Sequence, residues 1–292
     1  MLRFLSIGFF FAACGLTQTS VADLWEQKTL SRLKQLDAQW DGVIGAVAID
    51  LTTGHVISYN GNAVFPQASS IKIPVMIQIF RDVRAGKLQM DQEVAISMSE
   101  SVEDSKRFDA AAKTAGKMKL RELIEAMIEM SDNAATNKLI AMAGMAQVNR
   151  TLDEMSLINT RLRRKMIDIA AATRDEENVS TPMDMARLAE MLYRGKVVDE
   201  AASKEMLEIM TRTNADMRKA VPTAVRVAAK PGELNQVKCE TGIIFLDKRP
   251  FALSVASTFN GADRNPLQDM IRIFFHHFEM LDHSNRYGRS LQ

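Results

Sequence analysis

The stretch Ala68-Ser69-Ser70-Ile71-Lys72-Ile73-Pro74-Val75 places two reactive side chains at the start of an apolar helix. Ser69 and Lys72 are three positions apart, which in a helix puts them on one face, one turn from each other. An amine at that distance can take the proton of a hydroxyl and make its oxygen a nucleophile. Because Ser69 stands where the helix begins, free backbone N–H groups there favour the negative charge of an oxyanion. The stretch therefore predicts a serine nucleophile with Lys72 as its base.

This spacing alone is a weak signal, because Ser31-Arg32-Leu33-Lys34 shows it inside an ordinary amphipathic helix. Two further groups give it context. Ser131-Asp132-Asn133 lies between two helical patterns and offers a hydroxyl and an amide, and Lys230-Pro231-Gly232 follows a strand-like run over residues 224–229. Each group by itself is compatible with a helix cap or a turn.

Taken together and in this order, the three groups resemble the S-x-x-K, S-D-N and K-T-G signature of class A β-lactamases and penicillin-binding proteins. The resemblance runs from about residue 40 to 280. It implies a β-lactam or peptidoglycan-like peptide as substrate, acylation of Ser69, Lys72 as the activating base and Ser131 as a proton relay.

The same resemblance assigns the substrate contacts. It implies that Asn133 holds the substrate and that Lys230 steers a substrate carboxylate, with Gly232 beside it on the strand. The oxyanion hole would be the backbone N–H of Ser69 together with the backbone N–H of Glu233.

The chain departs from the signature at the loop that carries the deacylating glutamate in class A enzymes. In the run Arg164-Lys165-Met166-Ile167-Asp168-Ile169-Ala170, Met166 takes the glutamate position. Loss of a general base costs ~10² to 10⁴ in rate. Asp168 is the nearest candidate for a water-activating base, and the alternative is a structural ion pair of Asp168 with Arg161 or Arg164.

Two more departures lie on the strand side of the site. Pro231 replaces the threonine of K-T-G, which removes a hydroxyl and a backbone N–H donor. Lys238 is a candidate replacement for an arginine that pairs with the substrate carboxylate in relatives, and a solvated surface lysine is the alternative.

The order of periodic segments predicts an α+β fold, a three-layer α/β/α sandwich of the β-lactamase/transpeptidase kind. A helix at 24–40 precedes strands at 43–50 and 55–60, helical stripes start near 120, 134 and 182, and strands return at 224–229, 241–246 and 251–259 before a helix at 266–281. Both ends would build one antiparallel sheet, with an all-helical subdomain inserted. We expect one catalytic domain over 23–292, with its α/β part at about 23–64 and 215–282 and its helical part at about 65–214.

The first 22 residues read as a signal peptide, with Arg3, an apolar run over residues 4–16 and the small-residue site Ser20-Val21-Ala22. This predicts export to the periplasm or the medium. Anchoring as a lipoprotein through Cys14 is the alternative. The apolar run is shorter than the ~20 residues that span a bilayer, so no transmembrane span is expected.

The composition of the chain limits the kinds of ligand and binding partner that we expect. The 292 residues carry a formal charge of +1, which gives no reason to expect nucleic acid as a partner. The four histidines and the single cysteine outside the leader, Cys239, show no metal-ligand spacing, so neither a metal nor another cofactor is expected. A monomer that acts on a small molecule is the expectation.

Three functions fit these residues. The first is β-lactam hydrolysis through an acyl-enzyme on Ser69. The second is a penicillin-binding D,D-peptidase that deacylates slowly, which the missing glutamate favours. The third is a non-catalytic binding protein of the same fold, which the complete S-x-x-K and S-D-N groups disfavour.

Overall fold

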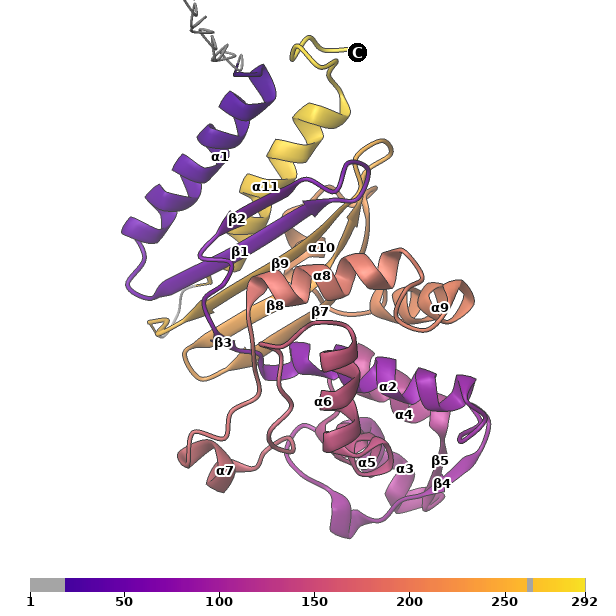
Figure 1. The fold of residues 1–292 in the computed structure, drawn as a ribbon. Coiled ribbons are helices and arrows are strands. Elements are labelled where there is room, and N and C mark those ends of the chain that lie inside the picture. The colour runs from indigo at the N-terminus through magenta and orange to yellow at the C-terminus, as the bar shows by residue number, and fades with distance from the viewer. Residues whose placement is uncertain (1–18, 262–264, 292) are drawn as a thin grey trace, which may run out of the picture.

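The computed structural model describes residues 19–261 and 265–291, and its centre is a five-stranded sheet built from both ends of the chain (Figure 1). The strand order is β2-β1-β9-β8-β7, and every neighbouring pair is antiparallel. The bounds are β1 Val43–Asp50, β2 Val56–Tyr59, β7 Arg226–Leu234, β8 Val237–Phe245 and β9 Phe251–Thr258. N-terminal β1 lies between β2 and C-terminal β9, so the sheet is built from both ends of the chain, as the sequence pattern predicts.

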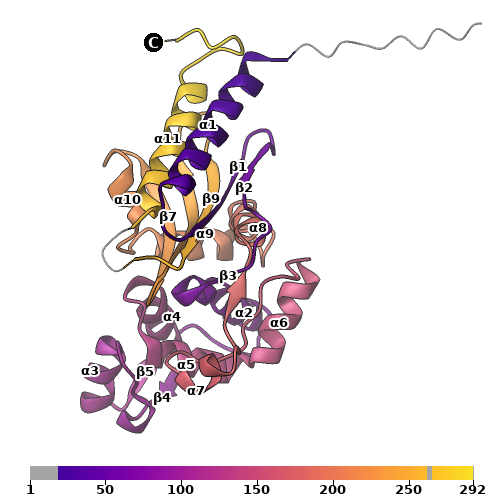
Figure 2. The same cartoon turned by 90° about the vertical axis from the view of Figure 1, so that its left-hand side faces the viewer.

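Helices cover both faces of this sheet. The first helix α1 (Val21–Ala38) lies beside the last, α11 (Leu267–Asp282), on one face together with α10 (Asp216–Ala220), whereas α8 (Pro182–Tyr193) crosses the other (Figures 1 and 2). Strand β1 shows why two layers are needed, because its successive side chains point to opposite faces. Ile44, Ala46 and Ala48 belong to the core under α11, and Val47 and Ile49 to the core under α8. The α/β/α sandwich predicted from sequence is confirmed.

The inserted region between β2 and β7 is mostly helical and packs around α2 (Lys72–Arg84), which is buried over most of its length. The other helices are α3 Lys106–Thr114, α4 Leu120–Glu129, α5 Asn133–Ala143, α6 Met145–Glu154, α7 Ile169–Thr173 and α9 Glu200–Met210, with 3-10 turns η1 Ala68–Ile71 and η2 Met98–Glu100. Two short ladders complete it, β3 Phe65–Pro66 with β6 Val179–Ser180, and β4 Glu93–Ala95 with β5 Lys117–Lys119.

The strands β7 and β8 are both longer than their patterns predict, and together they form a hairpin. Lys230-Pro231-Gly232 does not follow a strand end but lies within β7, which continues to Leu234 and turns into β8 through Asn235 and Gln236. Pro231 is accommodated because β7 is the edge strand of the sheet, where a missing N–H is least costly. The turn is made possible by the left-handed backbone of Gln236, with φ of 59°.

At the N-terminus, α1 begins at Val21, and the Ser20 side chain caps it by accepting from the Asp23 backbone N–H. Most of the predicted signal peptide, residues 1–18 with Arg3 and Cys14, lies outside the described residues. Within the described part of the chain, no helix is both long and apolar enough to cross a bilayer.

Candidate active site

Ser69 lies in η1, at the point where the helical region meets the edge of the sheet. It is half-buried, and the preceding residue, Ala68, has a left-handed backbone with φ of 39°. Gly232 of β7 comes very close: a Cβ at this position would lie 2.8 Å from the Ser69 backbone nitrogen and 2.9 Å from the Gln67 carbonyl oxygen. The Ser69 amide and the β7 edge therefore adjoin, which is the arrangement that a two-amide oxyanion hole needs.

Lys72, at the start of α2, is completely buried. Its Nζ lies within hydrogen-bond distance of three oxygens, 2.6 Å from the Ser131 carbonyl oxygen, 3.0 Å from Ser131 Oγ and 2.9 Å from Asn133 Oδ1. Burial, followed by repulsion from the Lys230 ammonium, holds the pKa of Lys72 well below its usual value. A neutral amine keeps a free lone pair, and that is the form able to take a proton from Ser69.

Ser131 lies between the two lysines. Its Oγ accepts from Lys72 Nζ and, at 3.1 Å, from Lys230 Nζ. Its backbone is left-handed, with φ of 57°, between α4 and α5. Lys230 is buried as well, and burial lowers the pKa of its ammonium to about 8. The hydroxyl is thus oriented by two amines, and its own proton remains available for a third group.

Asn133 and Asp132 fix this corner of the site. Asn133 accepts from Lys72 and donates from Nδ2 to the Glu103 carbonyl oxygen at 3.0 Å. Asp132 is buried and caps α5 through the Ala135 N–H, while its second oxygen accepts two backbone N–H groups from the start of α3. Asp132 therefore has a structural role in the S-D-N group, and the residues on either side of it face Lys72.

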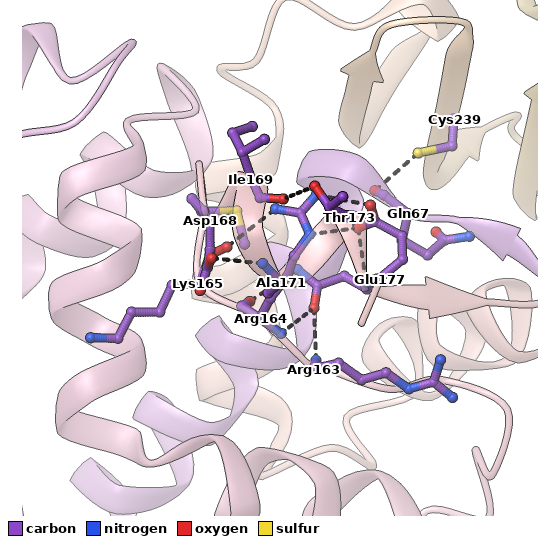
Figure 3. A network of polar contacts seen from close by, with 12 residues as sticks. Gln67, Arg163, Arg164, Lys165, Asp168, Ile169, Ala171, Thr173, Glu177 and Cys239 are labelled. Carbon is purple, nitrogen blue, oxygen red and sulfur yellow. Dashed lines mark hydrogen bonds and ion pairs between the residues drawn. The ribbon is translucent and has the colours of Figure 1, made fainter. Parts of the chain in front are cut away.

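The loop that departs from the family signature, residues 163–178, is closed at its base by polar contacts (Figure 3). Arg164 makes a double hydrogen bond with Glu177, with both N···O distances 3.0 Å. Asn178 Oδ1 accepts from the backbone N–H of Arg163 and of Arg164, and the Asn178 carbonyl accepts from the Gln67 N–H at 2.8 Å. The loop is thereby tied to the residue two positions before Ser69.

Met166 is buried in this loop, and its backbone is held on both sides by Asn137 of α5, which donates to the Met166 carbonyl at 3.1 Å and accepts from its N–H at 2.8 Å. Sequence reasoning missed Asn137. A signal existed, because Asn137 follows Asn133 by one helical turn, so both amides lie on one face of α5.

Asp168 is exposed, and its carboxylate caps α7 by accepting from the Ala171 N–H at 3.0 Å. Neither arginine considered as its ion-pair partner takes that role: Arg161 pairs with Asp153 and Arg164 with Glu177. Hydrogen bonds thus link Lys72, Ser131, Asn133 and Lys230, and the backbone of Ser69 adjoins Gly232. Among the described residues, no side chain of that group hydrogen-bonds to Asp168.

Glu233 and Lys238 face each other across the β7–β8 hairpin. They are directly paired in the register of the two strands, and Lys238 Nζ contacts the Glu233 carboxylate, which is largely exposed. The ammonium suggested for the substrate carboxylate therefore already has a partner within the chain.

A second contact that sequence reasoning missed lies behind the nucleophile. Ser70 is buried and donates from Oγ to the Lys230 carbonyl at 3.0 Å, and the Cys239 thiol lies 3.1 Å from the Gln67 carbonyl and 3.3 Å from Ser70 Oγ. Figure 3 shows the Cys239 contact with Gln67. Burial raises the pKa of Cys239 to about 11, so the group is a thiol at neutral pH. These contacts hold η1 against the sheet.

No cluster of three or more metal-ligating side chains occurs in residues 19–261 and 265–291. The candidate site contains a serine, two buried lysines and the hydroxyl of Ser131. The sequence model of the β-lactamase enzyme family matches residues 28–272 of this chain. The chain belongs to the β-lactamase enzyme family.

Individual relatives are similar to this chain over most of its length. It is 26% identical to the imipenem-hydrolyzing β-lactamase of Enterobacter cloacae, over 87% of this chain and 89% of that protein, and 26% identical to β-lactamase ROB-1 of Haemophilus influenzae, over 82% and 79%. Among solved structures, a class A β-lactamase reconstructed for the last common ancestor of Gram-negative bacteria matches with a TM-score of 0.80 at 25% identity, covering 86% of this chain and 98% of that one. The fold of PBP-A also matches, with a TM-score of 0.77 at 22% identity, covering 88% and 96%.

Proposed function

We propose that this β-lactamase family member opens the amide bond of β-lactams through an acyl-enzyme on Ser69. The observation that carries the proposal is the buried, internally bonded Lys72 beside a half-exposed serine, with Ser131 shared between Lys72 and Lys230. The relatives that are named β-lactamases support the same chemistry.

The proposed reaction moves protons among Ser69, Lys72 and Ser131. Neutral Lys72 takes the Ser69 proton as Oγ bonds to the lactam carbonyl carbon, and the carbonyl oxygen becomes an oxyanion facing the backbone N–H groups of Ser69 and Glu233. The C–N bond then breaks, and the ring nitrogen receives a proton from Ser131, which is resupplied from Lys72. Asn133 orients the substrate amide, and Lys230 attracts the substrate carboxylate. Water hydrolyses the ester and frees Ser69.

Intact-mass measurement over time tests this proposal. Purified protein mixed with a modest excess of a penicillin gains the mass of one drug molecule if Ser69 is acylated. Ser69→Ala is expected to remove the adduct, and Ser31→Ala, which changes the other S-x-x-K serine, is the matched control that keeps it. An adduct that survives Ser69→Ala would show that another residue is the nucleophile.

A second candidate function is slow turnover of the kind expected of a penicillin-binding D,D-peptidase. It is favoured by the buried thioether of Met166 at the glutamate position and by Asp168, whose carboxylate is engaged in capping α7. A solved structure of similar fold, PBP-A with a leucine-to-glutamate change, is an acyl-enzyme complex with penicillin G.

The lifetime of the adduct separates the two functions. Rapid decay with consumption of the drug means hydrolysis and makes Asp168→Asn the next variant, which should slow the decay if Asp168 activates water. A lasting adduct means slow turnover. In that case Met166→Glu should shorten the adduct's life and Met166→Gln should not, because only a carboxylate can act as the base.

The location and organisation of the protein belong to the same proposal. We infer export to the periplasm or the medium after removal of residues 1–22, with residues 23–292 acting as one monomeric catalytic domain. Sequencing the N-terminus of the protein recovered from cells tests this, since lipidation at Cys14 would leave a different, modified N-terminus.

A further inference from the structure

A cavity of about 610 Å³ lies away from Ser69, between the end of α8, the first turns of α9, the start of β7 and the end of β8. Arg226 lines it at the first position of β7, four residues before Lys230, which corresponds to roughly 13 Å along a strand. The volume falls within the range of small-molecule sites. The cavity is thus distinct from the acylation site.

The lining is rich in positive charge. It contains Arg194, Lys196, Lys204 and Arg226 against one carboxylate, that of Glu200. The two arginines already have glutamate partners outside the lining, Glu190 and Glu208 respectively. Lys196 and Lys204, by contrast, form no ion pair with any residue in the described part of the chain. Two ammonium groups are therefore available to an anion.

The other groups that line the cavity can contact an aromatic ring and donate to a hydrogen-bond acceptor of a ligand. The rings of Tyr193 and Phe245 lie 6.2 Å apart between centroids, and Phe245 is stacked against the Arg226 guanidinium at 4.6 Å. Ser203 is only 2% exposed, yet its Oγ has no hydrogen-bond partner. A buried hydroxyl without a partner is costly, so it points to a group that supplies an acceptor.

We propose that this cavity binds a small aromatic carboxylate. The ring packs against Tyr193 and Phe245, and the carboxylate takes hydrogen bonds from Lys196, Lys204 and the hydroxyl of Ser203. The opposite-charge contacts and the ring contacts together explain why neither inorganic anions nor neutral aromatics satisfy the whole lining.

Calorimetric titration with 2-naphthoate tests the proposal, with 2-naphthol and inorganic phosphate as partial probes. We expect naphthoate to bind more tightly than either, and the double variant Lys196→Ala/Lys204→Ala to lose affinity by on the order of tenfold or more. Lys106→Ala/Lys113→Ala, which removes two exposed lysines of α3 that form no ion pair within the described chain, is the matched control. Ser203→Ala should weaken the binding of both naphthoate and phosphate, because both anions would accept from its hydroxyl.

Failure of naphthoate to bind at millimolar concentration, equal binding to the two double variants, or displacement of naphthoate by acylation of Ser69 would each overturn the proposal. The outcome is separable from that of the proposed function, because naphthoate binding should persist in Ser69→Ala. The cavity variants should in turn be acylated by penicillin at the rate of the unmodified protein, which also shows that they are folded.

Discussion

Gly232 is the residue whose replacement most directly tests the geometry of the site. A Cβ there would lie within 3 Å of backbone atoms of Ser69 and Gln67, which cannot move aside as a flexible side chain could. We predict that Gly232→Ala slows acylation of Ser69 by on the order of a hundredfold, the effect of misplacing one oxyanion-hole amide. Stopped-flow acylation measures it.

The control is Gly261→Ala, since a Cβ at that position would meet no atom within 4 Å. Its acylation rate should equal that of the unmodified protein. A Gly232→Ala protein that folds and is acylated at the normal rate would show that the β7 edge does not contribute to the oxyanion hole.

The two buried lysines predict how acylation depends on pH. Lys72 must be neutral to accept a proton, so the rate should rise with pH until its lowered pKa is passed. Lys230 must be charged to attract the substrate carboxylate, and with a pKa of about 8 it loses that charge above pH 8. We predict a bell-shaped profile of kcat/KM, with its alkaline limb near pH 8.

Lys230→Arg separates the two limbs. A guanidinium stays charged, so the alkaline limb should move to higher pH while the acid limb stays in place. An unchanged alkaline limb in this variant would assign that limb to another group.

At the scale of elements, α10 is held by a buried carboxylate from the neighbouring strand. Glu240 of β8 is completely buried and accepts from the backbone N–H of Asp216 at 2.7 Å and of Met217 at 2.8 Å. Burial raises the pKa of Glu240 to about 7, against the opposing effect of these two amides. The group therefore keeps its proton in the folded chain at pH values where the unfolded chain has lost it.

The raised pKa of Glu240 determines whether the stability of the protein rises or falls with pH, because the buried carboxyl stabilises the folded chain only while it is protonated. Its contribution is fully present below the ordinary glutamate pKa of about 4.5 and is lost as pH rises to about 7, above which the curve is flat. We predict that the free energy of unfolding falls over this window by about 3 kcal/mol from this residue, and that Glu240→Gln flattens the curve. Urea unfolding between pH 4.5 and 8 measures it, and Glu279→Gln, at a partly buried position of α11, is the control that should keep the slope.

Most elements could be predicted from sequence because their apolar periodicity is set by burial on one or two faces. This holds for β1, β2, β9, α4, α8 and α11. The continuation of β7 through Pro231 could not be predicted, because only the tertiary position of β7 at the sheet edge makes a proline acceptable there.

Some residues of the candidate site could likewise be predicted from sequence, and others could not. Spacing in the chain indicated Ser69 and Lys72, and the resemblance to the family signature added Ser131, Asn133 and Lys230. The structure joins Lys72, Ser131, Asn133 and Lys230 through hydrogen bonds. The contacts of Cys239 with Gln67 and Ser70 join residues about 170 positions apart, for which no local pattern exists. The partner of Lys238 also depended on the strand register, which sequence alone left open.

At the scale of the whole molecule, α11 closes one face of the sheet. Its Met270, Phe274 and Phe278 are buried against strand residues, and the Phe278 ring stacks on Phe251 at 4.2 Å. Removing one such phenylalanine typically costs about 3 to 5 kcal/mol, a large part of the stability of a domain. We predict that a chain ending at Asn260 does not fold.

Circular dichroism and thermal melting measure whether the chain that ends at Asn260 folds. A chain ending at His283, just after α11, is the control and should melt cooperatively near the unmodified protein. A cooperative melt of the shorter chain would show that the sheet is stable without its last helix.

The pairing of β1 with β9 also sets an order of events during synthesis. On the ribosome β1 and β2 emerge first, and the strand that completes them follows roughly 200 residues later. Until then the long edge of β1 has no partner, and the apolar side chains on both of its faces are exposed to chaperones and proteases. The sheet cannot close before nearly the whole chain has been translated.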